Sequence, residues 1–420
     1  MLKLRRATVI DASPPPGAAS GEQRLIVELS PQGEPGAEQP PARAAVADIS
    51  LVGLSQPGDE VIVNVEALDL GLGSGGFDVV HANLSRGLDG PGAASRNVMK
   101  LNYTSLQHTV EPVETVGSQQ LELPLGRPVA VLCLHGQLGP VAWAYAQAKP
   151  GARLGYVQTE GGALPGAHSR VVAALRRAGL LAGHITAGAS HGGELEAVST
   201  AGALHHGLAA LGWDAAVVGP GPGIVGSSSR LGHGGLAALD SAHVALALGC
   251  PALLVARMSS ADGRERHRGI SHHTLTVLDL LLDPVTVALP AGMRSPVGAD
   301  LRAGLGSVFG GSGGSRPALA LDVERPVRIT RHDWRRAEVD LPAYAASGLP
   351  AETMGRTLAQ DPLFFGAALA GGAALAELAP AADGPEAGPP SGSSRSGPDA
   401  GPALDESALP AGPGGPGGAA

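Results

Sequence analysis

After Leu125 the chain repeats one pattern, a short apolar segment followed by a longer segment with helical periodicity. This alternation is typical of βαβ units, whose strands form a parallel sheet with helices packed on it. The sequence therefore predicts an α/β fold, a Rossmann-like, mostly parallel sheet with helices on both faces. Strands are predicted at 129–134, 153–158, 184–187, 215–219, 251–258 and 285–289, and helices at 138–149, 166–179, 193–211, 234–249 and 271–282.

The first 120 residues show a different pattern, in which short apolar stretches are separated by Gly- and Pro-rich turns. Several stretches alternate apolar and polar residues, as in Val61-Ile62-Val63-Asn64-Val65-Glu66, and no helix-period segment interrupts them. A small antiparallel β-barrel or sandwich is therefore predicted to precede the α/β region. Its strands are expected at 23–30, 44–52, 60–68, 77–84 and 98–103, with a polar loop at 32–42.

The C-terminal segment is predicted to be a disordered tail. From Pro380 to Ala420, 33 of the 41 residues are Pro, Gly, Ala or Ser, and none is aromatic. Such a segment buries too little apolar surface to offset the entropy lost on ordering. The predicted domains are thus an N-terminal β domain at 1–122, an α/β domain at 126–376 and a Pro/Gly/Ala-rich tail at 380–420. Within the α/β domain a Gly/Ser-rich loop is expected at 306–317, followed by helical structure at 341–376.

Charge, cysteine content and apolar runs narrow the class of protein. The net charge is −9, and five acids and one arginine in the tail supply −4 of it, so no basic field is available to recruit nucleic acid. Cys133 and Cys250 each lie in an apolar run, which indicates two buried thiols in a reducing compartment. The N-terminus lacks the apolar stretch of a signal peptide, and the longest apolar run, 244–256, is too short to span a membrane. We therefore expect a soluble cytoplasmic protein without a membrane partner.

Polar side chains follow the predicted strands at the points where those strands end. In an open parallel sheet, ligands bind beyond the carboxyl ends of the strands, so these exit loops are where a site is expected. Half of the fourteen histidines are predicted to lie along this one edge: His135, His168, His191, His233, His267, His272 and His273. Their convergence is more informative than any single motif.

The densest of these loops runs from Arg264 to His273, and Asp262 lies just before it. Ser271 is a plausible N-cap, which places His272 and His273 in the first turn of a helix. The positive end of the helix dipole favours neutral imidazoles there, suited to metal ligation, general-base catalysis or polarising a carbonyl. The exposed amides of that turn, with Arg266 and Arg268, would also hold an anion.

Three interpretations of this loop remain open: a solvated basic loop capped by a serine, an anion or substrate site, and a metal site. The spacing of His267, His272 and His273 matches no standard zinc pattern, so a metal would need ligands from other loops. No metal ligands are assigned, and the sequence names no cofactor.

A glycine-rich segment follows the fourth predicted strand. Gly221-Pro222-Gly223-Ile224-Val225-Gly226 satisfies the G-x-G-x-x-G pattern of dinucleotide sites. It contains a proline, the next helix begins only near Gly234, and the following strand ends in Arg257 and Met258 instead of an acid, which all count against a nicotinamide site. A glycine-lined wall for another ligand, with Arg230 as a donor, and a purely structural loop both stay open.

Carboxylates also occur at strand exits. Glu160, followed by two glycines, is a candidate general acid or base, and Glu194 fits the same role or a place in a helix first turn. His205, His206 and His243 fall within predicted helices, where packing explains them better. The sequence contains no Gly-x-Ser-x-Gly elbow and no Cys-x-x-Cys pair, which disfavours the common hydrolase and zinc-ribbon classes.

Several long segments, taken together, resemble the bacterial family catalogued as domain of unknown function 3866. They occur in order along roughly residues 1–370, at 64–76, 99–107, 159–165, 221–226, 230–232 and 265–274. The family name implies no activity and no catalytic residues. In that family another residue often stands at the position of His191, and serine often stands at that of His135, which favours Arg266, His267, His272 and His273 as site residues. The excess of arginine over lysine, 26 against 3, suggests a high-GC source such as an actinobacterium.

The sequence leads to one principal hypothesis, a small-molecule enzyme of hydrolase or transferase type that acts on an anionic or phosphorylated substrate at the carboxyl edge of the sheet. The alternatives are a non-catalytic ligand-binding or regulatory protein that uses the same crevice, and a scaffold that binds partners through the β domain. A homo-oligomer stays open. The candidate catalytic residues are His272, His273, His267 and Glu160, and the candidate substrate- or anion-binding residues are Gly221, Gly223, Gly226, Arg230, Asp262, Arg266, Arg268 and Ser271.

Overall fold

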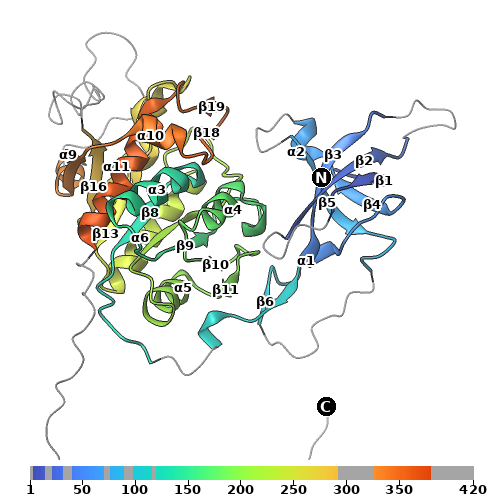
Figure 1. Cartoon of the computed structure of the whole chain (residues 1–420), viewed down its shortest axis with the longest axis horizontal. Helices are drawn as coiled ribbons and strands as arrows, with labels where there is room; N and C mark the ends of the chain where they lie inside the picture. The colour runs from blue at the N-terminus through green and yellow to red at the C-terminus, as the bar shows by residue number, and fades with distance from the viewer. Residues whose placement is uncertain are drawn as a thin grey trace, which may run out of the picture. The chain divides into compact units, whose positions relative to one another are not determined.

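The computed structural model describes seven stretches of the chain (Figure 1), all within a unit that spans Met1–Pro380. They are residues 3–14, 21–31, 40–70, 76–88, 98–115, 120–291 and 325–379. The predicted loop at 306–317, the predicted tail at 380–420 and most of the predicted loop at 32–42 lie outside the described residues. Within the described stretches, no helix combines the length and apolarity needed to cross a membrane.

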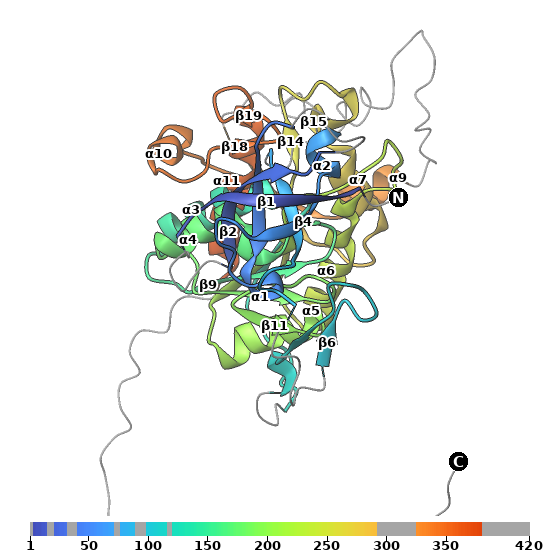
Figure 2. The same ribbon diagram turned by 90° about the vertical axis from the view of Figure 1, so that its right-hand side faces the viewer.

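The N-terminal strands close into a five-stranded barrel, in the order β1-β2-β3-β5-β4. Figure 2 labels three of them, β1, β2 and β4. Alternate residues such as Val61 and Val63 on one strand, and Leu25 and Val27 on another, point inward and are fully or almost fully buried. Neighbouring strands pair antiparallel except β3 and β5, which pair parallel. The predicted small barrel is confirmed. Its strands are β1 (Leu4–Ala12), β2 (Glu22–Leu29), β3 (Arg43–Asp48), β4 (Glu60–Asn64) and β5 (Asp78–Asn83).

Three predicted strands of this region were too long, and two strands, β1 and β7 (His108–Val110), were not predicted. The segment 44–52 ends as a strand at Asp48, whose side chain accepts a hydrogen bond from Ser50 and caps the one-turn helix α1 (Ile49–Val52). Helix α2 (Glu66–Asp69) likewise ends the segment predicted at 60–68. The segment 98–103 is a strand only over β6 (Val98–Lys100), because positive φ angles at Leu101 and Tyr103 turn the chain toward β7 (His108–Val110). In β1 only Ala7 and Val9 are buried, which explains its weak sequence signal.

The α/β region is built on an eight-stranded sheet in which every pair of neighbouring strands is parallel. Its order is β11-β10-β9-β12-β8-β13-β16-β17, and the predicted parallel sheet is confirmed. The central strands are buried along their whole length, as a sheet covered on both faces requires. The strands are β8 (Val129–Leu132), β9 (Leu154–Thr159), β10 (Gly183–Ala187), β11 (Leu195–Ala197), β12 (Ala215–Pro220), β13 (Ala252–Val255), β16 (Thr286–Pro290) and β17 (Asp333–Ala337).

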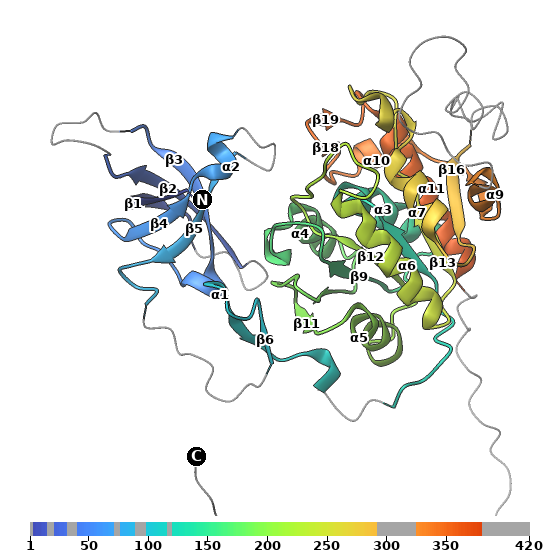
Figure 3. The same ribbon diagram turned by 180° about the vertical axis from the view of Figure 1, so that it is seen from behind.

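Helices cover both faces of this sheet. One core packs α3 (Leu138–Ala148), α4 (Arg170–Arg177), α10 (Leu341–Ala346) and α11 (Pro362–Leu378) against one face. The other core packs the opposite face against α5 (Thr200–His205) with its continuation η4 (His206–Ala210), α6 (Ala237–Ala247), α7 (His272–Leu280) and α9 (Arg325–Thr330); α6 and α7 are seen together in Figure 3.

Short elements complete the described chain. They are the 3₁₀ turns η1 (Val113–Thr115), η2 (His135–Gln137), η3 (Gly166–His168), η5 (Gly234–Leu236) and η6 (Glu265–His267), and the two-residue strands β14 (Met258–Ser259), β15 (Gly269–Ile270), β18 (Glu352–Thr353) and β19 (Arg356–Thr357).

The predictions for the α/β region were wrong at both edges of the sheet and at one exit. Residues 193–199 are not helical: Leu195–Ala197 forms edge strand β11, and the helix begins only after its N-cap, Ser199. The opposite edge strand, β17, was not predicted because Asp333-Trp334-Arg335-Arg336-Ala337 has few apolar residues. The segment 251–258 is interrupted after Val255, and Met258–Ser259 instead pairs with β15.

Chain topology places the crevices of the sheet. Strands β8 and β9 lead to α3 and α4 on one face, whereas β12 and β13 lead to α6 and α7 on the other. In the sheet these four strands alternate in the order β9-β12-β8-β13. Adjacent exit loops therefore diverge to opposite faces, which is the arrangement that opens a ligand crevice at the carboxyl ends of strands.

A glycine socket on β9 and β10 gives a test of this packing. The buried ring of Trp213 lies where side chains of Gly155, Gly183 and Gly207 would project, and a Cβ at Gly155 would come within 1.9 Å of Trp213 Cε3. We expect Gly155→Ala to lower the free energy of unfolding by about 1–3 kcal/mol, because the ring must shift inside a packed core. Denaturant unfolding measures this. Gly263→Ala, where a Cβ meets nothing within 4 Å, is the control, and equal stability of the two variants would contradict the socket.

Candidate functional site

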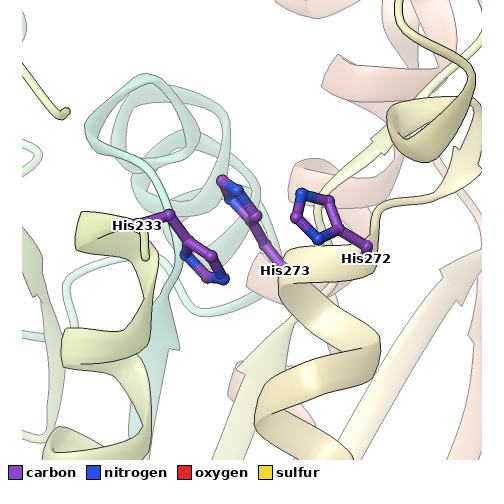
Figure 4. A group of neighbouring side chains, drawn as sticks. All are labelled: His233, His272 and His273. Atoms are coloured by element: carbon purple, nitrogen blue, oxygen red, sulfur yellow. The ribbon is translucent and has the colours of Figure 1, made fainter. Parts of the chain in front are cut away.

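Four histidines come together beside the start of α7, and Figure 4 shows three of them, His233, His272 and His273. His272 and His273 are the first two residues of that helix, and the Ser271 side chain accepts a hydrogen bond from the His273 amide, as the capping pattern predicted. His267 ends η6, and His233 immediately precedes η5 at the start of α6. All four are at least 94% buried. The loops after β12 and β13 thus bring them to the predicted carboxyl edge.

The imidazole rings are in direct contact. Those of His233 and His273 stack with centroids 3.6 Å apart and planes 10° apart. The centroid of His272 lies 4.5 Å from that of His273 and 4.9 Å from that of His267. The predicted alternative of a solvated basic loop therefore does not describe these histidines, because they are packed ring against ring away from water.

Arg257 is the charged residue at the centre of this group, and sequence reasoning missed it as a site residue. It follows β13, it is only 3% exposed, and its Nη1 donates a hydrogen bond to Nδ1 of His273 over 2.8 Å. Its backbone N–H donates to Oγ1 of Thr274 and its carbonyl accepts from the Ser271 amide. The available signal was a charged residue directly after an apolar strand. We call His233, His267, His272, His273, Arg257 and Arg266 the histidine–arginine cluster.

The carboxylate of Asp262 links Arg257 to two further arginines. Asp262, 1% exposed, lies 3.7 Å from Nη2 of Arg257. Its two oxygens accept 2.9 Å hydrogen bonds from Nε and Nη2 of Arg264, and one of them also accepts from Arg356 at 3.3 Å. Burial alone would raise the pKa of Asp262, but the hydrogen bonds and charge of Arg264 outweigh it and hold that pKa well below its usual range. Asp262 is therefore ionised and surrounded by arginines.

The electrostatics of the cluster keep its histidines neutral. Burial, followed by the positive charges of Arg257 and Arg264, lowers the pKa of His267 to about 3. Burial and then the neighbouring His233 and arginines lower that of His272 to about 4. The pKa of His273 is lowered further by the same causes. At neutral pH these imidazoles are uncharged, and the causes are burial and neighbouring positive charges instead of the helix dipole expected from the sequence. Burial lowers the pKa of Arg257 only to about 10, which leaves it cationic.

Several buried nitrogens of the cluster lack a hydrogen-bond partner among the described residues. They are Nε of Arg257, Nε of Arg266, Nε2 of His272 and both ring nitrogens of His233. Burial lowers the pKa of His233, and the nearby Arg230 carbonyl offsets this only in part and forms no hydrogen bond of normal geometry with the ring. Buried polar groups are nearly always paired, so a group of unpaired ones indicates a missing partner. Because guanidinium nitrogens can only donate, that partner has to supply acceptor atoms.

The same histidines are also the group most suited to a metal ion. One ring nitrogen from each of His233, His272 and His273 can be chosen so that all three lie within 4.8 Å of one another. Two features oppose this use. Parallel rings 3.6 Å apart cannot both direct in-plane lone pairs at one ion, and Arg257 already donates to His273 and adds positive charge. The arrangement therefore fits an anion better than a cation.

The other predicted residues of this edge have structural partners. Arg230 pairs with Asp279 over 2.9 Å, and exposed Arg268 donates to the Asp262 carbonyl. Ser271 Oγ lies 2.8 Å from His267 Nδ1. Of the predicted glycines, Gly223 accepts a hydrogen bond from the Ala163 amide and Gly226 forms an isolated bridge with His233, while a Cβ at Gly221 would meet the Gln158 amide. These glycines thus pack the loop after β12 against its neighbours.

Glu160 is in a different place from the histidines. It lines a cavity of about 230 Å³ at the ends of β9 and β10, where α5 and α6 begin. The cavity is otherwise lined by Thr159, Ala187, Gly188, Val198, Ser199, Thr200, Ala237, Asp240 and Ser241, none of which is basic. None of the residues of the histidine–arginine cluster lines this cavity.

Three of the seven edge histidines do not join the cluster. His135 contacts Tyr156 and Ser169 through its two ring nitrogens, with the Ser169 Oγ at 2.7 Å. Nε2 of His168 lies 3.9 Å from a carboxylate oxygen of Asp48, and His191 packs beside His108. The exit loops of β8 and β9 lead to the face covered by α3 and α4, and β10 lies farther from β13 in the strand order. None of these loops therefore lies beside the loop after β13 on the face covered by α7.

The chain was also compared with known proteins. A family model described as "Protein of unknown function (DUF3866)" matches residues 44–372, most of the chain and all of the histidine–arginine cluster. No curated protein and no solved structure matches it.

Proposed function

This chain belongs to the DUF3866 family, whose description assigns no reaction, and we propose from the site itself that it is a small-molecule enzyme acting on an anionic or phosphorylated substrate. The histidine–arginine cluster binds the anionic group. The observation that carries the proposal is the set of buried, unpartnered nitrogens on Arg257, Arg266 and His272. A phosphate or carboxylate supplies several acceptor oxygens at once and matches guanidinium geometry.

Each residue of the cluster has a chemical role in this proposal. Arg257, already cationic and held by Asp262, and half-buried Arg266 neutralise the anion. His272, neutral and with an unpartnered Nε2, is the candidate general base. His267 and Ser271, linked through 2.8 Å, hold the first turn of α7 in place. Direct contact of Asp262, Arg230 or Arg268 with substrate stays a prediction, as does a role for Glu160.

The experiment measures the binding of inorganic phosphate by titration calorimetry and by the shift in Tm. It compares the wild type with Arg266→Met and His272→Gln. Phosphate is expected to raise the Tm of the wild type, and each variant should weaken binding by about ten- to a hundredfold, the effect of one lost hydrogen bond to a charged group. The control is Arg335→Met, because Arg335 is a surface arginine paired with Asp333. Equal phosphate affinity in all four proteins would contradict the proposed site.

The metal alternative has its own observation, the three histidines whose nitrogens approach within 4.8 Å. Elemental analysis of untagged protein, beside the double variant His272→Ala/His273→Ala, tests it directly. We expect no stoichiometric zinc, manganese or iron in either sample. Near-stoichiometric metal that is lost in the double variant would replace the anion site with a metal-dependent, hydrolytic enzyme.

Turnover separates the proposed enzyme from a sensor that uses the same residues. A panel of phosphorylated and carboxylated metabolites should contain compounds that both stabilise the protein and are consumed by it. A ligand that stabilises the protein and is never consumed would favour the non-catalytic alternative.

A further inference from the structure

We infer that Arg257 fixes His273 as the tautomer protonated on Nε2, so that His273 is a neutral hydrogen-bond donor to a substrate oxygen and not a base. The substrate is then an anionic compound whose reacting carbonyl or phosphoryl oxygen gains negative charge. This inference rests on the proposed function for its substrate, but its first step concerns the protein alone.

The tautomer follows from the donor inventory of the two side chains. All guanidinium nitrogens of Arg257 donate and none accepts, so Nδ1 of His273, 2.8 Å from Nη1, has to be the acceptor. A neutral imidazole carries one proton, which is then on Nε2. An imidazolium would direct its own Nδ1–H at the guanidinium, so protonation of His273 would break the pair.

The pair is held by bonds that do not depend on the two side chains. The Arg257 N–H donates to Oγ1 of Thr274 over 2.9 Å, and the Arg257 carbonyl accepts from the Ser271 amide over 2.8 Å. The N-cap of α7, Ser271, and the residue that follows His273, Thr274, are thereby tied to the backbone of Arg257. On the far side, Asp262 approaches the other end of the guanidinium at 3.7 Å. The geometry of the pair is thus set by the fold.

The surroundings of His273 agree with a donor role. The groups that face it are cationic Arg257 and the neutral imidazoles of His233, His267 and His272, and the nearby carboxylate of Asp262 is occupied by arginines. In such a site an N–H donor stabilises charge as it develops on a substrate oxygen, with no reorganisation of solvent. His273 transfers no proton in this role. His272, whose Nε2 is unpartnered, is left as the residue able to accept one.

The test is the tautomer itself, read from long-range ¹H–¹⁵N spectra of protein labelled at histidine nitrogens, with His273 assigned by comparison with His273→Gln. In wild-type protein without ligand at pH 7 we expect a protonated Nε2 and an unprotonated Nδ1. Arg257→Met should shift His273 toward the Nδ1-protonated form or a mixture, Arg257→Lys should restore the wild-type pattern, and Arg264→Met should leave it unchanged. Protonation of Nδ1 in the wild type would overturn the inference, and that measurement needs no variant to fold.

Phosphate distinguishes failure of this inference from failure of the proposed function. Inorganic phosphate should shift the Nε2–H resonance of His273 in the wild type, and Arg257→Met should bind it about tenfold more weakly. The expected tautomer without any phosphate binding would refute the anion site. Phosphate binding that leaves the His273 Nε2–H unmoved would keep the anion site and overturn the donor role.

Discussion

Acidification from pH 7 to pH 5 is expected to lower the free energy of unfolding by roughly 4–8 kcal/mol, at about 2 kcal/mol for each strongly shifted histidine. Among the buried histidines whose pKa is lowered chiefly by burial, His135 and His272 are lowered to about 4 and His184 and His267 to about 3, and that of His273 is lowered further. The ordinary pKa of a histidine side chain is 6.5, and this value applies to the unfolded chain. Below pH 6.5 the unfolded state therefore binds more protons than the folded state, and the free energy of unfolding falls.

The window follows from the same values. The contribution is fully present above pH 6.5, is lost as pH falls, and levels off near pH 3–4, where the folded protein takes up the protons too. Denaturant unfolding at each pH measures the loss, and its slope gives the number of protons taken up on unfolding. His267→Gln/His272→Gln should reduce that number by about two at pH 5. A stability that stays flat between pH 7 and pH 5 would contradict the burial of neutral imidazoles.

Anion binding should modify this acid response. A phosphate in the histidine–arginine cluster places negative charge beside His272 and His267 and so favours their protonated forms. The stability lost on acidification should then be smaller with phosphate than with chloride at equal ionic strength. The difference should disappear in Arg266→Met. An identical pH profile in both salts would argue against an anion at this position.

Asp262→Asn is expected to destabilise the protein by about 3–5 kcal/mol, which is the usual cost of removing one partner from a buried ion pair. Asp262 is 1% exposed and is the acidic residue nearest to Arg257, which is itself 3% exposed. An amide of the same shape cannot neutralise Arg257, Arg264 and Arg356, and Arg257 would be left as a buried charge. Chemical denaturation at pH 7 measures the effect.

The matched control is Asp333→Asn, which removes the acid of an exposed pair with Arg335. Such surface pairs contribute at most about 1 kcal/mol. The double variant Asp262→Asn/Arg257→Met removes both charges and should recover part of the stability lost in Asp262→Asn alone. If Asp262→Asn costs no more than Asp333→Asn, the arginine network does not hold Arg257 in the way described.

Features governed by neighbours in sequence could be predicted from the sequence. The apolar strands and amphipathic helices after Leu125 follow local periodicity, and the sheet is parallel because helical segments separate its strands. Ser271 as an N-cap, with His272 and His273 in the first turn, follows from capping preferences that span four residues. The barrel could likewise be predicted from the alternation of apolar and polar residues, and the apolar residues Val61 and Val63 are buried as that pattern requires.

Features that join distant segments needed the tertiary structure. Arg257 and His273 are sixteen residues apart, and their 2.8 Å contact exists because β13 ends beside the start of α7. His233 stacks on His273 from another loop, whereas Glu160, equally plausible in sequence, lies in a separate cavity. Edge strands β11 and β17 carry weak patterns and exist through pairing with β10 and β16. Local propensity cannot encode such partners, because strand order and packing decide which exit loops meet. The sequence by itself thus determined the elements and the place of His272 and His273 in the first turn of α7. Tertiary packing decided their burial and the charges around them, which together keep them neutral.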